Sequence, residues 1–238
     1  MMLEIENLNT YYGAVHALRD ANLTVSEGET GALLGRNGMG KSTTLKSIMG
    51  LAKAKSGKIN FEGQSIFGFP PYKVAKSGIA YVPEERRIFP NLTVLDNLSM
   101  GMKMRDKRDL KEDYKWPLER VYKHFPILSE RSNQNAITLS GGEQQMLTIA
   151  RSLMGNPSLL LVDEPTEGLS PGMTREVRDI LAEIAKTGVA ILFVEHNLKV
   201  AMSLADRIYL MGKAHLGFVG TVKELDEQPE IRAKYLEV

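Results

Sequence analysis

The residues best suited to chemistry form a glycine-rich segment that contains one lysine and one serine. Residues 35–42 read GRNGMGKS and fit the phosphate-binding pattern G-x-x-x-x-G-K-[ST] at every fixed position. Glycines let the backbone wrap closely around a polyphosphate, Lys41 supplies positive charge for the β- and γ-phosphates, and Ser42 offers a hydroxyl to Mg²⁺. The candidate nucleotide-binding residues of this segment are Gly35, Arg36, Asn37, Gly38, Met39, Gly40, Lys41, Ser42 and Thr43.

The elements on either side of this segment are those that a phosphate loop needs. Residues 32–34 end an apolar run that predicts a strand, and Leu45, Ile48 and Met49 recur at helical spacing until Gly50. A strand, a glycine loop and a helix in this order point backbone N–H groups and the positive end of a helix dipole at one place. The alternative is a flexible glycine turn, and the flanking elements favour nucleotide binding.

Two carboxylates follow a second apolar run. Residues 159–162 are continuously apolar, which suits a strand buried on both faces of a parallel sheet. Asp163 and Glu164 come next, at the edge where open α/β sheets bind ligands. Asp163 can hold Mg²⁺ through its water shell, and Glu164 can polarise a water molecule. The structural alternative is that both acids only end the strand.

The segment LSGGEQQM at 139–146 has two interpretations. Ser140 and Glu143 have the spacing of a capping box ahead of an apolar helical face, which predicts a well-capped helix. Gly141 and Gly142 would also leave the first-turn N–H groups open to an anion, which predicts a second phosphate site. The residues alone do not separate these interpretations.

Two ring-bearing side chains complete the candidate site. His196 leaves an apolar run at 189–194 on the side where the phosphate loop also emerges. Tyr12, in a turn-like setting at 11–13, could stack on a nucleobase, although a tyrosine pair more often serves packing. The remaining histidines are interpreted as structural: His16, His124 and His215.

Composition and charge narrow the classes of protein. The chain has 238 residues, of which 43% are hydrophobic, enough for one sizeable core and a smaller subdomain. A net charge of +1 does not indicate a general nucleic-acid binder, and the mixed charges at 103–113 favour a solvated helix face. There is no cysteine, hence no disulfide framework. The apolar runs are far shorter than the roughly twenty residues of a membrane span, and 1–6 do not resemble a signal peptide, so we expect a soluble protein on the cytoplasmic side.

The order of the elements predicts an α/β fold. Short strands at 3–8, 22–25 and 59–61 predict a small antiparallel sheet beside the phosphate loop. Between 84 and 156 the pattern is helical, with Pro117 and Pro126 as breaks, and from 206 we expect one last strand, a turn at 212–213 and a polar helix. We therefore expect a P-loop (RecA-like) α/β core with an antiparallel β subdomain, over 1–83 and 157–238, and an inserted helical subdomain over 84–156.

With these motifs placed, essentially the whole chain resembles the ATP-binding subunits of ABC transporters. The phosphate loop, LSGGE at 139–143, LLLVDE at 159–164 and His196 occur in that family's order. A finer resemblance is to the ATPases of branched-chain (hydrophobic) amino-acid uptake, through YVPEERRIFP at 81–90 and LSGGEQQM. The urea and short-amide uptake ATPases are close relatives, and DEPTEG at 163–168 leans toward them.

The resemblance implies roles and partners for these positions. Tyr12 would stack on adenine, Glu164 would be the general base, and His196 would sense the γ-phosphate. Ser140 and Gly142 would bind the γ-phosphate of ATP held by the other subunit of a head-to-tail dimer. That second subunit would be a copy or a paralogue, both would bind polytopic permease subunits, and a solute-binding protein would act indirectly. The cofactors would be ATP and Mg²⁺, with no nucleic acid.

Two positions depart from the commonest family pattern. Glu84 stands where most members have glutamine, and it would be a supplementary Mg²⁺ ligand beside Ser42 and Asp163. Ser170 stands where many members have aspartate, which weakens inference about signalling between subunits through that loop. Residues 88–90 form an apolar step that would face the permease or contact the core.

The expected function is ATP hydrolysis that drives solute import, with branched-chain amino acids as the favoured solutes. The alternatives are a urea or amide uptake ATPase, a lipid or lipopolysaccharide export ATPase, and a soluble ABC ATPase that acts on nucleic acid. The last class usually joins two cassettes or carries a long coiled coil, and this chain shows neither. The expected location is peripheral, on the cytoplasmic face of the inner membrane.

Overall fold

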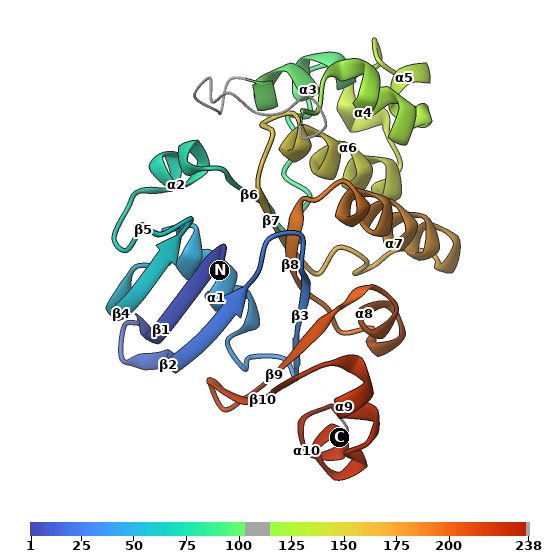
Figure 1. Ribbon diagram of the computed structural model, residues 1–238. Coiled ribbons are helices and arrows are strands. Elements are labelled where there is room, and N and C mark those ends of the chain that lie inside the picture. Colours follow the sequence, from blue (N-terminus) through green and yellow to red (C-terminus); the bar gives the residue numbers. More distant parts are fainter. Residues whose placement is uncertain (103–114, 237–238) are drawn as a thin grey trace.

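The computed structural model describes residues 1–102 and 115–236, which form two sheets and a set of helices (Figure 1). The strands are β1 Leu3–Tyr12, β2 Val15–Val25, β3 Thr30–Gly35, β4 Ala54–Phe61, β5 Gln64–Ser65, β6 Ile79–Val82, β7 Leu159–Asp163, β8 Ala190–Val194, β9 Arg207–Gly212 and β10 His215–Gly220. The helices are α1 Lys41–Ile48, α2 Pro71–Ser77, α3 Val94–Met102, α4 Leu118–His124, α5 Pro126–Glu130, the 3-10 helix η2 Ala136–Thr138, α6 Gly141–Leu153, α7 Pro171–Lys186, α8 Leu198–Leu204, α9 Val222–Asp226 and α10 Pro229–Leu236. The charged cluster at 103–113 lies outside the described residues.

The central sheet has the strand order β10-β9-β3-β8-β7-β6. Strands β9 to β6 are parallel, and only β10 runs antiparallel to its neighbour. Alternate side chains of β7 enter two different cores: Leu160 and Val162 face the large helical side, and Leu159 and Leu161 face α1 and the second sheet. Continuous apolar runs are typical of strands covered on both faces, so the predicted α/β class is confirmed.

The second sheet is antiparallel, in the order β2-β1-β4-β5. Its buried residues share a core with Leu45 and Ile48, so α1 lies between the two sheets, as Figure 1 shows. Both predicted N-terminal strands are longer than expected. Pairing continues to Tyr12↔Val15, so the tyrosine pair lies at the end of a strand and not in a turn.

All described elements between β6 and β7 are helical, and they gather at one end of the molecule (Figure 1). The predicted breaks at Pro117 and Pro126 are confirmed, since each proline stands at the start of a new helix. Pro117 is the N-cap of α4 and Pro126 begins α5, because a residue at a helix start needs no N–H donor. Val94 and Leu98 of α3 join the core of the central sheet, so the helices are packed against the sheet.

The carboxyl ends of β3, β8 and β7 meet at one edge, since Leu33 pairs with Val194 and Val194 with Asp163. This edge carries the phosphate loop, the two acids and the His196 loop together. The chain turns after β9 and adds β10 as the outermost strand beside it, a strand that the sequence analysis did not predict.

Candidate nucleotide site

The phosphate loop depends on glycine for its shape. Gly35 has φ +151° and Gly40 has φ +102°, both in the region that disfavours L side chains. A Cβ on Gly35 would also collide with the carbonyl oxygen of Met211, and one on Gly40 would lie 2.6 Å from the carbonyl oxygen of Ala17. The loop therefore runs against β9 and β2, and α1 begins at Lys41, directly after it.

Lys41 is held close to the loop that it follows. Only 4% of its surface is exposed, and its Nζ donates a 3.1 Å hydrogen bond to the carbonyl oxygen of Arg36. Burial lowers the pKa of Lys41, while the charges of Glu164 and Asp163 oppose that shift. A buried ammonium with two carboxylates nearby is suited to receive phosphate charge.

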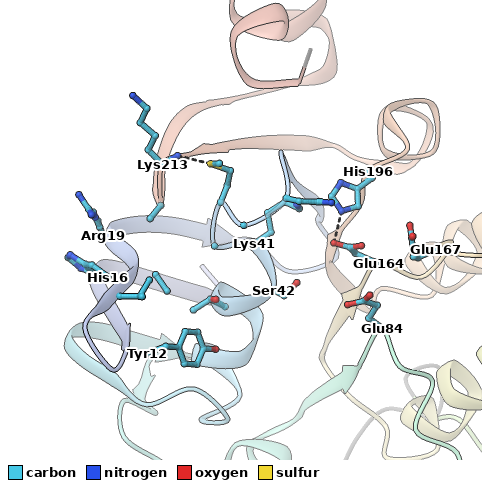
Figure 2. A pocket seen from close by; sticks show the side chains of 18 residues that line it. Tyr12, His16, Arg19, Lys41, Ser42, Glu84, Glu164, Glu167, His196 and Lys213 are labelled. Carbon is cyan, nitrogen blue, oxygen red and sulfur yellow. Dashed lines mark hydrogen bonds and ion pairs between the residues drawn. The ribbon is translucent and has the colours of Figure 1, made fainter. Parts of the chain in front are cut away.

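A cavity of about 1000 Å³ opens beside this loop (Figure 2). The sequence-predicted residues that line it are Tyr12, Asn37, Gly38, Met39, Gly40, Lys41, Ser42, Thr43, Glu84, Glu164 and His196. The other lining residues are Val15, His16, Ala17, Arg19, Glu167, Lys213 and Ala214. Gly35 and Arg36 line a neighbouring cavity of about 700 Å³ that also reaches His196.

Asp163 lies beneath the cavity and accepts two hydroxyl hydrogen bonds. Ser42 Oγ donates to its Oδ1 at 2.8 Å, and Tyr81 Oη donates to its Oδ2 at 2.9 Å. Burial raises the pKa of Tyr81, and the charge of Asp163 raises it further, so the phenol remains a donor. Tyr81 was not predicted as a site residue.

The oxygen donors here suit Mg²⁺ when phosphate oxygens and water complete the ligand set. Within 1–102 and 115–236, no group of three acidic or histidine side chains could hold a metal on its own. The Ser42 hydroxyl and the Asp163 carboxylate are hard oxygen donors directly beside the loop that would hold the phosphates. Glu84 is exposed and lines the same cavity from beyond β6.

Glu164 and His196 point toward each other across the cavity wall (Figure 2). His196 Nε2 lies 2.8 Å from Glu164 Oε1. Burial raises the pKa of Glu164, the charges of His196 and Lys41 oppose that rise, and the charge of Glu84 adds to it. Glu164 also has φ +46°, a strained value for a residue with a side chain.

The far wall of the cavity is the hairpin of β1 and β2. The ring of Tyr12 is half exposed there, at 50%. His16, interpreted from sequence as structural, also lines the cavity; its ring stacks on Tyr11 with centroids 4.0 Å apart and its Nε2 lies 2.8 Å from Asn9 Oδ1. The signal that could have revealed His16 is the antiparallel pairing across the turn at 13–14, which places it opposite Tyr11.

The start of α6 lies outside this cavity. The capping box is confirmed: Ser140 N–H donates to Glu143 Oε2 at 2.7 Å, and Glu143 N–H donates to Ser140 Oγ at 3.4 Å. Of the described residues that line the cavity, none comes from the predicted set at 140–143. A single chain therefore brings together the phosphate loop, the acids and His196, but not the LSGGE segment.

Comparison with known proteins places these features in one family. The ABC transporter family model matches residues 18–167. The chain is 42% identical over 235 residues to the high-affinity branched-chain amino acid transport ATP-binding protein BraG of Pseudomonas aeruginosa, covering 99% of both. It is 37% identical to a probable LivF of Archaeoglobus fulgidus, named for the same transport, with 95% and 94% covered. It is also 32% identical to the lipopolysaccharide export ATP-binding protein LptB of Haemophilus influenzae, with 99% and 97% covered.

Solved structures agree with this assignment. A nucleotide-free ATP-binding cassette from an ABC transporter matches with a TM-score of 0.82 and 27% identity over 97% of this chain and 96% of that one. A dimeric cassette in a post-hydrolysis state, bound to ADP and Pi, matches with a TM-score of 0.80 and 25% identity over 93% and 99%. The chain therefore belongs to the ABC transporter family, as one of its ATP-binding and ATP-hydrolysing proteins.

Proposed function

We propose that this chain hydrolyses ATP to power the import of branched-chain amino acids through a membrane permease. The observation that carries the proposal is the 42% identity to BraG, which extends over 99% of both chains. The relative named for lipopolysaccharide export is less similar, at 32% identity over a comparable length. That export, and the uptake of urea or short amides, are the alternative functions.

The shared cavity supports the following roles for its lining residues and for Asp163 beneath it. Lys41 binds the β- and γ-phosphates, Ser42 and Asp163 hold Mg²⁺, and Tyr12 stacks on adenine. Glu164 polarises the attacking water as general base, because its pKa is raised toward the working range and the phosphate loop lies beside it. Mg²⁺ would neutralise charge on the phosphates. His196 would turn from Glu164 to the γ-phosphate when ATP binds.

A second subunit supplies what one chain lacks. Ser140 is exposed at the start of α6, away from the cavity of its own chain. We propose that Ser140, Gly141, Gly142 and Glu143 complete the nucleotide site of a partner subunit, and that ATP holds the two subunits together. The similarity to a dimeric cassette with ADP and Pi supports this arrangement.

The permease would contact an apolar groove between the sheet and the helical region. This groove, of about 330 Å³, is lined by Met49, Ala75, Gly78, Ile79, Ala80, Tyr81, Phe89, Met100, Gly101, Arg151, Ser152, Gly155 and Pro157. Phe89 and Met100 are 43% and 40% exposed, which suits an apolar partner. Phe89 belongs to the apolar step at 88–90. We propose that the helical subdomain at 84–156 transmits movement from the nucleotide to this groove.

The described residues contain no helix that is long and apolar enough to cross a membrane. We propose a peripheral location on the cytoplasmic face of the inner membrane, through permease subunits that receive solute from a solute-binding protein.

The experiment that tests the proposed solute is complementation of two strains. The chain is expressed in Pseudomonas aeruginosa without BraG and, separately, in a bacterium depleted of LptB. We expect ATP-dependent leucine uptake in the first strain and no restored growth in the second. Glu164→Gln is the control that should restore nothing in either strain. Restored lipopolysaccharide export without leucine uptake would show that the chain serves export and not import. Uptake of labelled urea in the first strain tests the remaining alternative.

A further inference from the structure

A buried carboxylate joins the two loops that carry Glu164 and His196. Glu195 has only 3% of its surface exposed. Its Oε1 accepts a hydrogen bond from the Thr166 hydroxyl, and its Oε2 accepts 2.8 Å hydrogen bonds from the N–H groups of His196 and Asn197. In the described part of the chain, no ion pair with a lysine or arginine involves it, and these three neutral groups satisfy the buried side chain.

The Glu195 side chain lies just beyond the last paired residues of β7 and β8, and it bonds one loop to the other. Strands β7 and β8 pair as far as Asp163 and Val194, and the last backbone contact is the 3.0 Å hydrogen bond from Glu164 N–H to the Val194 carbonyl oxygen. Beyond this point, side chains hold the loops together. One connection is the 2.8 Å contact between Glu164 and His196, and the other is the hydrogen bond between Thr166 and Glu195.

The two connections differ in what happens to them during the reaction. The contact between Glu164 and His196 must open if the carboxylate is to face water and the imidazole is to face the γ-phosphate, as the proposed function requires. The hydrogen bond between Thr166 and Glu195 is buried, and neither residue is among the described residues that line the cavity beside Lys41, so it can persist. It would keep the separation of the loops fixed while the two exposed side chains turn.

We propose that Glu195 and Thr166 are positioning residues for ATP hydrolysis, which hold the general-base loop and the His196 loop in register after their direct contact opens. The inference rests on the proposed roles of Glu164 and His196. It predicts that a break in this connection slows the chemical step and leaves ATP binding intact. Of the described residues, neither Thr166 nor Glu195 lines the cavity beside Lys41, and Glu195 lines the neighbouring cavity of about 700 Å³.

The test compares variants that differ by one hydroxyl. Thr166→Val removes the donor at nearly constant volume, and we expect kcat to fall about 10- to 100-fold, the effect of a displacement near 1 Å. The KM for ATP should change by less than about twofold, since binding is not altered. Thr166→Ser restores the hydroxyl and should recover most of the wild-type kcat. Thr187→Val is the matched control: it removes a hydroxyl that donates to the Ile184 carbonyl oxygen at the end of α7, and its kcat should equal that of the wild type.

Glu195→Gln tests the same connection from its other side if Thr166→Val does not fold. The amide keeps the side-chain volume but has one acceptor oxygen for three donors, so kcat should fall again with KM unchanged. The double variant should be no slower than the slower single variant, because both changes break one connection. A wild-type kcat in both single variants, a Thr166→Ser variant as slow as Thr166→Val, or a raised KM would each overturn the proposal. If Glu164→Gln hydrolyses ATP at the wild-type rate, the proposed roles themselves fail, whatever the Thr166 variants do.

Discussion

His196 Nε2 lies 2.8 Å from Glu164 Oε1, so the candidate base and the candidate phosphate sensor are bonded to each other. This contact engages Oε1 of the Glu164 carboxylate, and Glu164 and His196 both line the cavity beside the phosphate loop. Under the proposed roles, a γ-phosphate that bound His196 would compete with Glu164 for the imidazole. The proposed mechanism therefore expects His196 to exchange Glu164 for the γ-phosphate when ATP binds.

The first prediction concerns the pH dependence of hydrolysis. Burial raises the pKa of Glu164, and the negative charge of Glu84 adds to the rise. A general base works when it is deprotonated, so activity should fall on acidification at a higher pH than for an ordinary glutamate. Glu84→Gln removes the repulsion and should move this acidic limb of kcat/KM to lower pH.

The measurement is a kcat/KM profile for the wild type, Glu84→Gln and a matched control. Glu85→Gln is that control, because Glu85 is exposed, forms a 2.9 Å ion pair with Arg87 and is not among the described cavity-lining residues. Its acidic limb should coincide with that of the wild type. An acidic limb that moves upward in Glu84→Gln would contradict the electrostatic assignment.

The sequence predicted the features that depend on a few neighbouring residues. The phosphate loop and the capping box of Ser140 and Glu143 each lie within a few residues, so spacing alone indicated them. The bonds from Tyr81 to Asp163 and from Thr166 to Glu195 join separate segments. They depend on the order of β6, β7 and β8 in the sheet. A local sequence pattern does not predict that order.

The missed strand β10 has a similar explanation. Residues 215–220 alternate in burial, but the glycines at 217 and 220 weaken the strand pattern. The structure shows why glycine is suited here: a Cβ on Gly217 would collide with the Tyr235 hydroxyl group of α10. Glycine is needed at 217 because α10 packs against the strand there. The sequence of the strand alone does not reveal this contact.

The second prediction concerns Lys41. Lys41→Ala removes a buried cation from the phosphate loop, and truncation of such a contact costs on the order of 2–5 kcal/mol of binding free energy. Calorimetric titration with ATP should therefore show a large loss of affinity. Lys46→Ala, on the same helix, is the control and should bind ATP as the wild type does. Equal ATP affinity in Lys41→Ala and Lys46→Ala would show that Lys41 does not bind the phosphates.

The third prediction concerns Tyr81, which the sequence analysis did not place in the site. Its hydroxyl orients Asp163 through a 2.9 Å hydrogen bond, and loss of such a supporting contact typically costs 10- to 100-fold in metal affinity. Tyr81→Phe should therefore need about tenfold more Mg²⁺ for half-maximal hydrolysis. Tyr209→Phe is the control, since it also removes a phenol hydroxyl, one that donates to the Thr24 carbonyl oxygen. The same Mg²⁺ requirement in Tyr81→Phe as in the wild type would show that this bond does not support the metal.

The last prediction tests whether α6 acts on a partner subunit. Ser140→Arg places bulk and charge at the exposed start of that helix, outside the cavity of its own chain. The variant should bind ATP as a monomer with wild-type affinity, yet fail to dimerise and fail to hydrolyse ATP.

The change also removes a helix cap, which costs about 1 kcal/mol, so stability must be separated from assembly. Thr221→Arg provides the comparison, because Thr221 and Glu224 form the same capping box at the start of α9. Size-exclusion chromatography with ATP, in a Glu164→Gln background that slows hydrolysis, should show dimers for Thr221→Arg and monomers for Ser140→Arg. If Ser140→Arg dimerises with ATP to the same extent as Thr221→Arg, the LSGGE segment does not lie in the shared site, and the capping box is its whole role.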